Sequence, residues 1–350
     1  MRHVRYAGLL VAASAMLLGA NGASAQTHEL RIAHFVTPLH SVSKWIEGWA
    51  QRMEKESNGA LKFTIFPGAQ LGPPPKYHDI GRTGQADIVW LSHGFTPGLF
   101  PLSEISNLPY MVGSAEIGHK VLNDPELRSK YMDAEHMKQG LKPLLLMTHQ
   151  PGNIHTAKEP IRTTDDVKGK RLRFASPTIR ELIAALGGTP VGLPPTQIVE
   201  SMQRGTLDGA FIDYGGAGVA FKMGAVTKFT TETYSFVASF CICMNPDSFN
   251  KLPPNLQKLI ADSFVGVEKE VGEAWDSLDD IGKGIMMKDG MEPIVLSAEE
   301  DKKFRAVGAQ VSEPVIADLE KNGLPARAVH KLMLELSAKH EPTSRNFWKR

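Results

Sequence analysis

Residues 166–177 read DVKGKRLRFASP, and this stretch decides how the chain is expected to fold. A polar turn leads into the alternating run RLRF, which predicts a short β-strand because neighbouring side chains on a strand point to opposite faces. The following Ser176-Pro177 pair predicts the start of a helix, since serine caps helices and proline fits their first turn. A strand that runs straight into a helix is typical of α/β folds.

Strand-like and helix-like segments alternate on both sides of this stretch, which predicts an α/β fold with largely parallel sheets. Expected strands cover residues 30–37, 61–67, 86–92, 141–148, 171–175, 189–193, 207–213 and 292–296, with one long extended run over 229–244. Expected helices cover residues 41–57, 76–83, 177–186, 196–203, 298–322 and 326–338. We therefore expect two α/β lobes that are joined by extended crossings, with a ligand cleft between them.

A long helical pattern follows the Pro253-Pro254 pair and continues to Ile285. About 34 residues at ~1.5 Å each would make a helix of roughly 50 Å, which is longer than one small lobe. We expect this helix to span both lobes. The glycines within it argue against a straight rod; they are Gly266, Gly272, Gly282 and Gly284.

The first 25 residues carry the features of a secretory signal peptide. Arg2 and Arg5 precede an apolar run at residues 7–20, and Ala23-Ser24-Ala25 supplies an A-x-A cleavage site. The apolar run is shorter than the ~20 residues that span a bilayer, which disfavours the alternative of an uncleaved anchor. We expect an exported chain, and no later segment of the sequence is long and apolar enough to predict a membrane span.

The charge balance of the chain disfavours nucleic acid as a partner. The sequence has 39 Lys and Arg residues against 38 Asp and Glu residues, and loss of Arg2 and Arg5 with the leader leaves 37 against 38. Phosphate backbones are bound by proteins with a basic excess, which this chain does not have.

Two cysteines, Cys241 and Cys243, lie in the run SFVASFCICM at residues 235–244. Side chains two residues apart on a strand share one face, so both are expected to be buried as small apolar groups. A C-x-C pair alone supplies too few of the four ligands that a structural metal site normally has. We expect no metal site, no disulfide framework and no cofactor.

Arg171 and Arg173 share one face of the strand that ends beside the Ser176 helix start. A guanidinium at that place, next to free backbone N–H groups and the positive end of a helix dipole, would hold a carboxylate in a bidentate manner. The alternative is a surface strand with two solvated arginines, and the residues by themselves leave both interpretations open.

Residues 166–173 resemble the signature of the solute-binding proteins of TRAP (tripartite ATP-independent periplasmic) transporters. In that family an Asp, a Lys-Gly pair and an Arg recur at the spacing of Asp166, Lys168-Gly169 and Arg173. Further matches occur in consistent order along the chain, and no single one of them is decisive. They are Pro67, Gln70-Leu71-Gly72, residues 84–88, Leu108-Pro109-Tyr110, Gly188, Pro190, residues 202–209, Asn245 and Leu252-Pro253.

The resemblance implies a two-lobed periplasmic binding protein, type II-like, with a long helix across both lobes and closure on the ligand. Lobe I would comprise residues 26–150 and roughly 239–282, and lobe II residues 151–238 and roughly 283–350. In this family the arginine that matches Arg173 grips a ligand carboxylate. The implied partners are a small organic acid and the TRAP permease subunits in the membrane, and the implied location is the periplasm.

The sequence departs from the family at positions that bear on the ligand. Members that bind sialic acid or dicarboxylates often have a cleft asparagine where this chain has Ile212, and a second arginine of some members falls near Asn153. A family histidine near Thr233 is also missing. A less polar pocket with fewer positive charges favours a monocarboxylate with an apolar or aromatic body.

The remaining candidate wall residues follow strand ends or the crossing between lobes, where ligands collect in open α/β sheets. Each has a plain alternative as a core or surface residue, and Asp213 also leaves open a metal ion that bridges the acid. The candidates are Phe35, Thr37, His40, Trp90, Ser92, His93, His149, Gln150, Asn153, Ile212, Asp213 and Tyr214.

No catalytic motif is present in the sequence: it has no G-x-S-x-G elbow, no H-E-x-x-H, no P-loop and no G-x-G-x-x-G. We therefore expect a binding protein and not an enzyme. One alternative is an enzyme on the same fold that uses His93 or His149 as a general base. Another is a sensory protein that presents its liganded form to a receptor.

Overall fold

The structure, a computed structural model, describes residues 26–349, so the expected signal peptide lies outside the described residues. Two separate sheets organise the chain. The first has the order β2-β1-β3-β10-β4, formed by Leu61–Phe66, His28–Ala33, Ile88–Ser92, Ser239–Met244 and Lys142–Thr148. The second has the order β11-β9-β5-β8-β6-β7, formed by Glu292–Ile294, Phe229–Phe236, Gly152–Thr156, Gly209–Ile212, Arg171–Phe174 and Thr189–Gly192.

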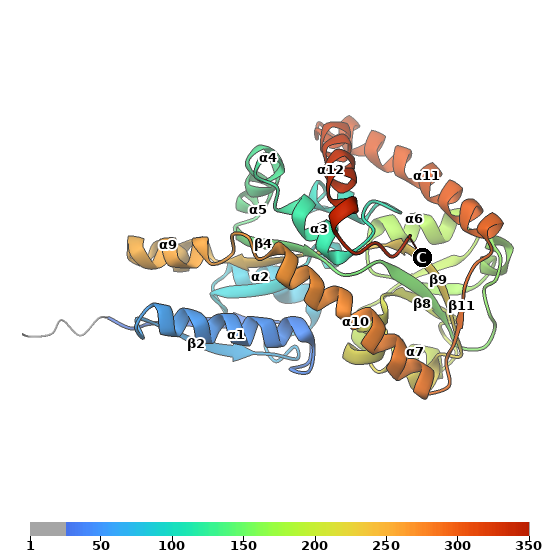
Figure 1. The fold of residues 1–350 in the computed structure, drawn as a ribbon, viewed down its shortest axis with the longest axis horizontal. Helices are drawn as coiled ribbons and strands as arrows, with labels where there is room; N and C mark the ends of the chain where they lie inside the picture. Colours follow the sequence, from blue (N-terminus) through green and yellow to red (C-terminus); the bar gives the residue numbers. More distant parts are fainter. Residues whose placement is uncertain (1–25, 350) are drawn as a thin grey trace, which may run out of the picture.

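We call the first sheet with its helices lobe I and the second sheet with its helices lobe II (Figure 1). The helices are α1 Ser41–Glu56, α2 Tyr77–Arg82, α3 Ala115–Leu122, α4 Pro125–Leu127, α5 Asp133–Lys138, α6 Pro177–Ala185, α7 Ile198–Gln203, α8 Pro246–Asn250, α9 Pro254–Asp262, α10 Glu268–Lys288, α11 Ala298–Lys321 and α12 Ala326–His340. Among the described residues, no helix has the length and the apolar character that a membrane crossing requires.

The sheets are mixed, which differs from the expected largely parallel arrangement. β1 pairs with β2 and β3 in parallel, but β10 runs antiparallel to both β3 and β4. In lobe II, β5 is antiparallel to β8 and β9, while β6 is parallel to its two neighbours. The antiparallel strands are the ones that cross between lobes, so their direction is set by the crossing and not by a helical connection.

The long extended run crosses between the lobes as the sequence predicts. β9 belongs to the sheet of lobe II, and β10, which starts three residues later, belongs to the sheet of lobe I. The strand β5 was not expected, because residues 151–156 begin with a turn-forming Pro-Gly pair and are short. β5 nevertheless forms the centre of lobe II between β9 and β8.

The expected single long helix is two helices. α9 ends at Asp262, Gly266 adopts a positive φ of 78°, and α10 then runs over 21 residues. Glycine permits this left-handed conformation, which ends the helical hydrogen-bond ladder. α10 still packs on both lobes and runs diagonally from one to the other (Figure 1). Added side chains at Gly272 and Gly282 would collide with Glu116 in lobe I and Tyr214 in lobe II, so these glycines permit close packing.

The C-terminal helix differs from the expected domain division. α12 packs on α3, and its residues Ala326, Val329 and Met333 are buried with the core of lobe I. α11 contacts α6 of lobe II before the chain turns back (Figure 1). The segment after residue 326 therefore lies against lobe I, which an amphipathic pattern alone does not show because it leaves the partner of the apolar face open.

The structure also corrects the prediction made for the two cysteines. Both are fully buried as expected, but the structure joins Cys241 and Cys243 in a disulfide with Cα atoms 5.3 Å apart. Two residues of a regular strand span about 6.6 Å. The register between β10 and β4 shifts between Ile242 and Cys243, and such local irregularity accompanies the shorter separation.

Candidate functional site

A small cavity of about 60 Å³ lies between the lobes, with walls from both sheets and from α10. Lobe I contributes the ends of β1 and β3, lobe II the ends of β6 and β8, and the crossing strands complete the enclosure. The lining residues are Phe35, Val36, His40, Trp90, Ser92, Phe95, His149, Arg173, Ala175, Pro195, Phe211, Ile212, Asp213, Gly216, Ala220, Phe221, Phe236, Ala238, Phe240 and Trp275.

Arg173 is the buried cation of this cavity, with 2% of its surface exposed. Its Nε donates to the carbonyl oxygen of Leu193 at 3.1 Å, and its Nη1 donates to that of Phe211 at 3.3 Å. Among the described residues no carboxylate forms an ion pair with it, and no acceptor is found for Nη2. Burying a charge without a partner is costly, so such a group indicates a binding function.

Burial lowers the pKa of Arg173 to about 10, and the nearby Asp213 carboxylate acts in the opposite direction. The guanidinium therefore stays charged at neutral pH. The neighbouring Arg171 has a different role, because its side chain is 43% exposed and forms a bidentate ion pair with Asp208 at 2.7 and 2.9 Å. Of the two arginines on this strand face, only Arg173 reaches the cavity.

Asp213 lines the cavity but is held by the protein itself. Its Oδ1 accepts from Gln150 Nε2 at 2.9 Å and from the backbone N–H of Gly216 at 2.7 Å. These bonds fix the turn between β8 and the π-helical segment Gly215–Ala220. The carboxylate therefore offsets part of the Arg173 charge from a fixed position, and Gln150 orients it without lining the cavity.

Aromatic rings form most of the remaining wall. Phe35 stacks on Trp90 with centroids 5.3 Å apart, and Phe240 stacks on Trp275 at 5.4 Å. Trp90 and Trp275 meet edge to face at 5.6 Å, which joins the two stacks into one surface. Among the described residues, the indole N–H groups of Trp90 and Trp275 have no hydrogen-bond partner. The wall that these four rings form is thus largely apolar.

Three of the four ring nitrogens of the two cavity histidines form hydrogen bonds within the protein. His149 accepts from Ala238 N–H with Nε2 at 2.9 Å, and its Nδ1 donates to the carbonyl oxygen of Gln150. His40 accepts from Val42 N–H with Nδ1, which places its proton on Nε2. Burial lowers the pKa of both side chains, that of His40 to about 3. Both are neutral wall groups at physiological pH, and His149 has no nitrogen left for general base chemistry.

Five of the sequence candidates do not line the cavity. His93 points instead to Ser239 and His136, and Tyr214 donates to Glu232 at 3.1 Å. Asn153 accepts from Tyr234 N–H at 2.9 Å, Gln150 holds Asp213, and Thr37 lies half-buried at the edge of lobe I. The other eight candidates, including Ile212, come together around the cavity. Ligand contacts of all thirteen stay predictions.

Sequence reasoning missed the aromatic residues that the crossing segments and α10 supply. Phe236, Ala238 and Phe240 alternate along the crossing run, so they present one face to the cavity. The length of that run already indicated a crossing, and crossing strands border the cleft. Trp275 lies in the middle of α10, where the helix passes behind the cleft.

A larger groove of about 640 Å³ lies on the surface between residues 98–105 of lobe I and α6 and α11 of lobe II. Arg180 and Glu181 in its wall are paired with each other at 2.6 Å and are exposed. This groove has no buried cation comparable to Arg173 among the described residues, so we place the candidate site in the smaller cavity.

Residues 32–318 match the family model described as bacterial extracellular solute-binding protein, family 7. The chain belongs to this family. Among curated relatives, the C4-dicarboxylate-binding periplasmic protein DctP of Rhodobacter capsulatus is 25% identical over 282 residues, covering 80% of this chain and 81% of that protein. A solute-binding protein of Albidiferax ferrireducens is 25% identical over 301 residues, covering 83% and 87%.

Solved structures of family members have the same two-lobed fold. A TRAP solute-binding protein from Rhodoferax ferrireducens, crystallised with copurified benzoate, superposes with a TM-score of 0.85 at 27% identity, covering 91% of this chain and all of that chain. A marine metagenome TRAP solute-binding protein specific for aromatic acid ligands gives a TM-score of 0.84 at 27% identity, covering 90% and 99%. The family resemblance and the two-lobed fold predicted from the sequence are confirmed.

Proposed function

We propose that this family member captures an aromatic monocarboxylate between its lobes in the periplasm and delivers it to the permease subunits of a TRAP transporter. Arg173 binds the carboxylate, and the stacked rings of Phe35, Trp90, Phe240 and Trp275 enclose the aromatic body. The observation that carries the proposal is a buried guanidinium without an ion-pair partner in an aromatic cavity.

The charge count of the cavity supports one carboxylate over two. Arg173 is its single buried cation among the described lining residues, and Asp213 already offsets part of that charge. A second carboxylate would be buried beside Asp213 without a cationic partner. Burying an unpaired ion in this way costs on the order of several kcal/mol. The curated relative that binds C4-dicarboxylates is therefore a weaker guide to this ligand than the aromatic-acid binders.

The walls support an aromatic ligand over a sugar acid. A sugar ring would bury several hydroxyl groups against phenyl and indole faces, and unpaired buried hydroxyls are unfavourable. Ser92 is a hydroxyl side chain among the lining residues, so a ring with a single hydroxyl group is compatible with the walls. The solved aromatic-acid binders provide precedents in benzoate and metahydroxyphenylacetate.

The test is a thermal-shift screen of the exported protein against benzoate, 3-hydroxybenzoate, phenylacetate, succinate and glucuronate. Ligand at ~1,000 times its dissociation constant should stabilise the protein by about 4 kcal/mol. We expect stabilisation by the aromatic acids, its loss in Arg173→Ala and its retention in Arg171→Ala, which removes an exposed arginine from the same strand. Stabilisation by succinate alone, or equal stabilisation of wild type and Arg173→Ala, would overturn the proposal.

A further inference from the structure

The crossing run leaves the sheet of lobe II through a bulge that contains Tyr234. Regular pairing of β9 with β5 is interrupted there, because residues 232–235 lie opposite the single residue Asn153. Within this bulge Tyr234 has a left-handed backbone, with a φ of 42°. Such a conformation is unfavourable for a residue with a side chain, and it persists only where neighbouring groups hold it.

Two aromatic residues near the end of the described chain hold Tyr234 in place. The ring of Phe347 stacks on the ring of Tyr234, with centroids 5.2 Å apart and planes inclined by 12°. Trp348 Nε1 donates a hydrogen bond to the backbone carbonyl oxygen of Tyr234 at 3.0 Å. We call residues 345–348, which include both aromatic residues, the C-terminal clasp. The clasp thus contacts both the side chain and the backbone of the residue with the left-handed conformation.

The C-terminal clasp is itself anchored to lobe I and to α10. The backbone N–H of Phe347 donates to the carbonyl oxygen of Gly113 in lobe I at 2.9 Å. A side chain at Gly113 would collide with Asn346, so the clasp lies closely against this part of lobe I. Both Nη atoms of Arg345 donate to the Asp280 carboxylate of α10 at 3.1 Å. The clasp therefore joins lobe I and α10 to the start of the crossing run.

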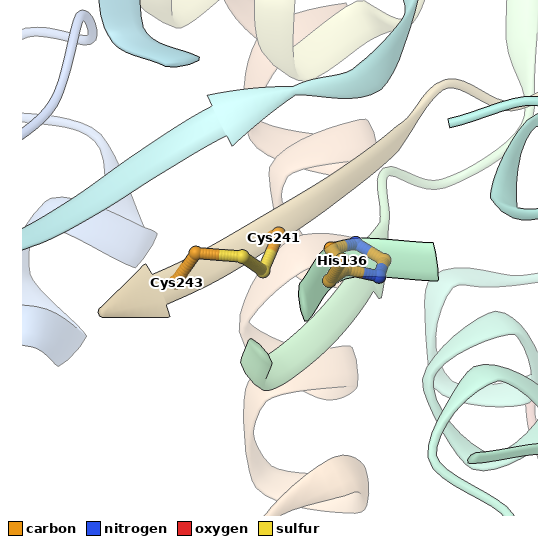
Figure 2. A group of neighbouring side chains, drawn as sticks. All are labelled: His136, Cys241 and Cys243. Atoms are coloured by element: carbon orange, nitrogen blue, oxygen red, sulfur yellow. A yellow bond between two sulfur atoms is a disulfide. The ribbon is translucent and has the colours of Figure 1, made fainter. Parts of the chain in front are cut away.

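The other end of the crossing run is fixed independently of the clasp. β10 pairs with β3 on one side and with β4 on the other. Its disulfide-linked Cys241 and Cys243 form a buried cysteine–histidine cluster with His136 of α5 (Figure 2). Movement of the run is therefore concentrated in residues 232–238, which lie between the regular parts of the two sheets.

We propose that the C-terminal clasp is a positioning element for ligand binding, which holds Tyr234 left-handed and so keeps Phe236 and Ala238 in the cavity wall. These two residues follow Tyr234 by two and four positions, so a change of φ at Tyr234 redirects the stretch that carries them. The inference rests on the proposed function, because it concerns the same cavity.

Removal of the clasp contacts should loosen the run without unfolding it. Tyr234 has further partners, since its N–H donates to Asn153 Oδ1 at 2.9 Å and its hydroxyl donates to Asp279 at 3.2 Å. The test variant is Phe347→Ala combined with Trp348→Phe, which removes the ring stack and the indole donor. Lys349→Ala is the matched control, because this neighbouring side chain is 65% exposed and pairs with Glu341 outside the clasp.

The first measurement is hydrogen–deuterium exchange of the ligand-free proteins, followed by mass spectrometry. We expect peptides that cover residues 232–238 to exchange roughly tenfold faster in the double variant, the ratio that corresponds to about 1.4 kcal/mol. Peptides from β2 in lobe I and α7 in lobe II should exchange as in wild type. A folded variant with unchanged exchange at residues 232–238, or with an equal rise throughout the chain, would contradict the proposal.

The second measurement is the dissociation constant of the best acid of the screen, by titration calorimetry. It should rise by roughly tenfold in the double variant and stay unchanged in Lys349→Ala. An unchanged constant in the double variant would show that the clasp does not position the cavity wall. If no acid binds wild type, the proposed function fails, whereas the exchange measurement still decides whether the clasp holds the run. If the double variant does not fold, Trp348→Phe alone removes the indole donor and keeps an aromatic ring.

Discussion

Gly94 of lobe I lies directly against Ala175 of lobe II. A Cβ atom at residue 94 would be 2.6 Å from the carbonyl oxygen of Ala175 and 3.0 Å from Cβ of Ser176. Side-chain carbons do not approach a backbone oxygen so closely, and no positive φ requires glycine here. Phe95 and Ala175 line the cavity, so this contact between the lobes lies beside the candidate site.

Gly94→Ala should therefore weaken ligand binding and leave the ligand-free fold intact. Overpacking a close contact costs roughly 1–3 kcal/mol, which corresponds to about 5- to 150-fold in affinity. Calorimetric titration with the best acid of the screen measures this loss. Gly48→Ala is the matched control, because a side chain at this exposed glycine of α1 meets no atom within 4 Å. Equal affinity of Gly94→Ala and wild type would show that ligand binding does not need this lobe contact.

Arg173→Ala should lose about 2–5 kcal/mol of binding free energy, or about 30- to 5,000-fold in affinity, because the ligand carboxylate would be buried without a partner. Arg173→Lys should also bind weakly, since one ammonium cannot reproduce the planar fork of the guanidinium. Titration calorimetry with wild type and Arg171→Ala provides the comparison. A Lys variant as strong as wild type would mean that a point charge suffices.

Asp213→Asn should strengthen acid binding, by roughly tenfold for a change of about 1.4 kcal/mol. The substitution keeps an oxygen for the backbone N–H of Gly216 but removes the negative charge near Arg173. The same change should lower the stability of the ligand-free protein, because Arg173 loses its compensating charge. Dissociation constants and denaturant midpoints of the two proteins test both effects. Weaker binding in the variant would show that Asp213 orients the guanidinium more than it repels the ligand.

The free energy of unfolding should fall as the pH rises from 6.5 to 8, because Glu104 is protonated in the folded state and loses its proton in this range. Burial, together with repulsion by Glu135, raises the pKa of Glu104 to about 8, far above the value of ~4.3 in an unfolded chain. Between these values the folded state binds more protons than the unfolded state, so the free energy of unfolding falls with rising pH. For this group the fall between pH 6.5 and 8 is roughly 1–2 kcal/mol.

Glu104→Gln removes this titration, and urea midpoints at the two pH values should then differ less than in wild type. Part of the fall in stability with rising pH should remain in the variant, because burial also raises the pKa of Asp276 to about 7 and that of Asp279 to about 8. The window begins at pH 6.5 because the buried histidines, whose lowered pKa values act in the opposite direction, titrate below it. Glu181→Gln, in an exposed carboxylate of α6, is the control. An unchanged pH dependence would mean that Glu104 ionises without cost in the folded protein.

Most elements of the fold could be predicted from the sequence because their signals are local. The amphipathic period of α1, the alternation of β2 and the Ser176-Pro177 start of α6 each specify an element within a few residues of its observed bounds. The break between α9 and α10 was less accessible, because the apolar period continues across Gly266 while the backbone does not. β5 was missed since a five-residue strand buried on both sides carries no period.

Only part of the candidate site, too, could be predicted from the sequence. Strand-end residues such as Phe35, Trp90 and Asp213 could be placed near the cleft from the α/β pattern alone, and Arg173 from its resemblance to the family motif. Trp275 and the cysteine–histidine cluster could not, because their partners lie far away in the sequence. The different fates of Arg171 and Arg173 depend on Asp208, which binds the former and leaves the latter for the cavity.

By itself the sequence determined the α/β class, the order of the elements, the crossing run and the family, because hydrophobic period, turn residues and motif spacing are properties of neighbouring residues. Only the tertiary structure decided which arginine is buried, which rings face each other, that α12 returns to lobe I and that His136 meets the two cysteines. These relationships depend on burial and on long-range contacts, which arise only when segments distant in the chain pack against one another.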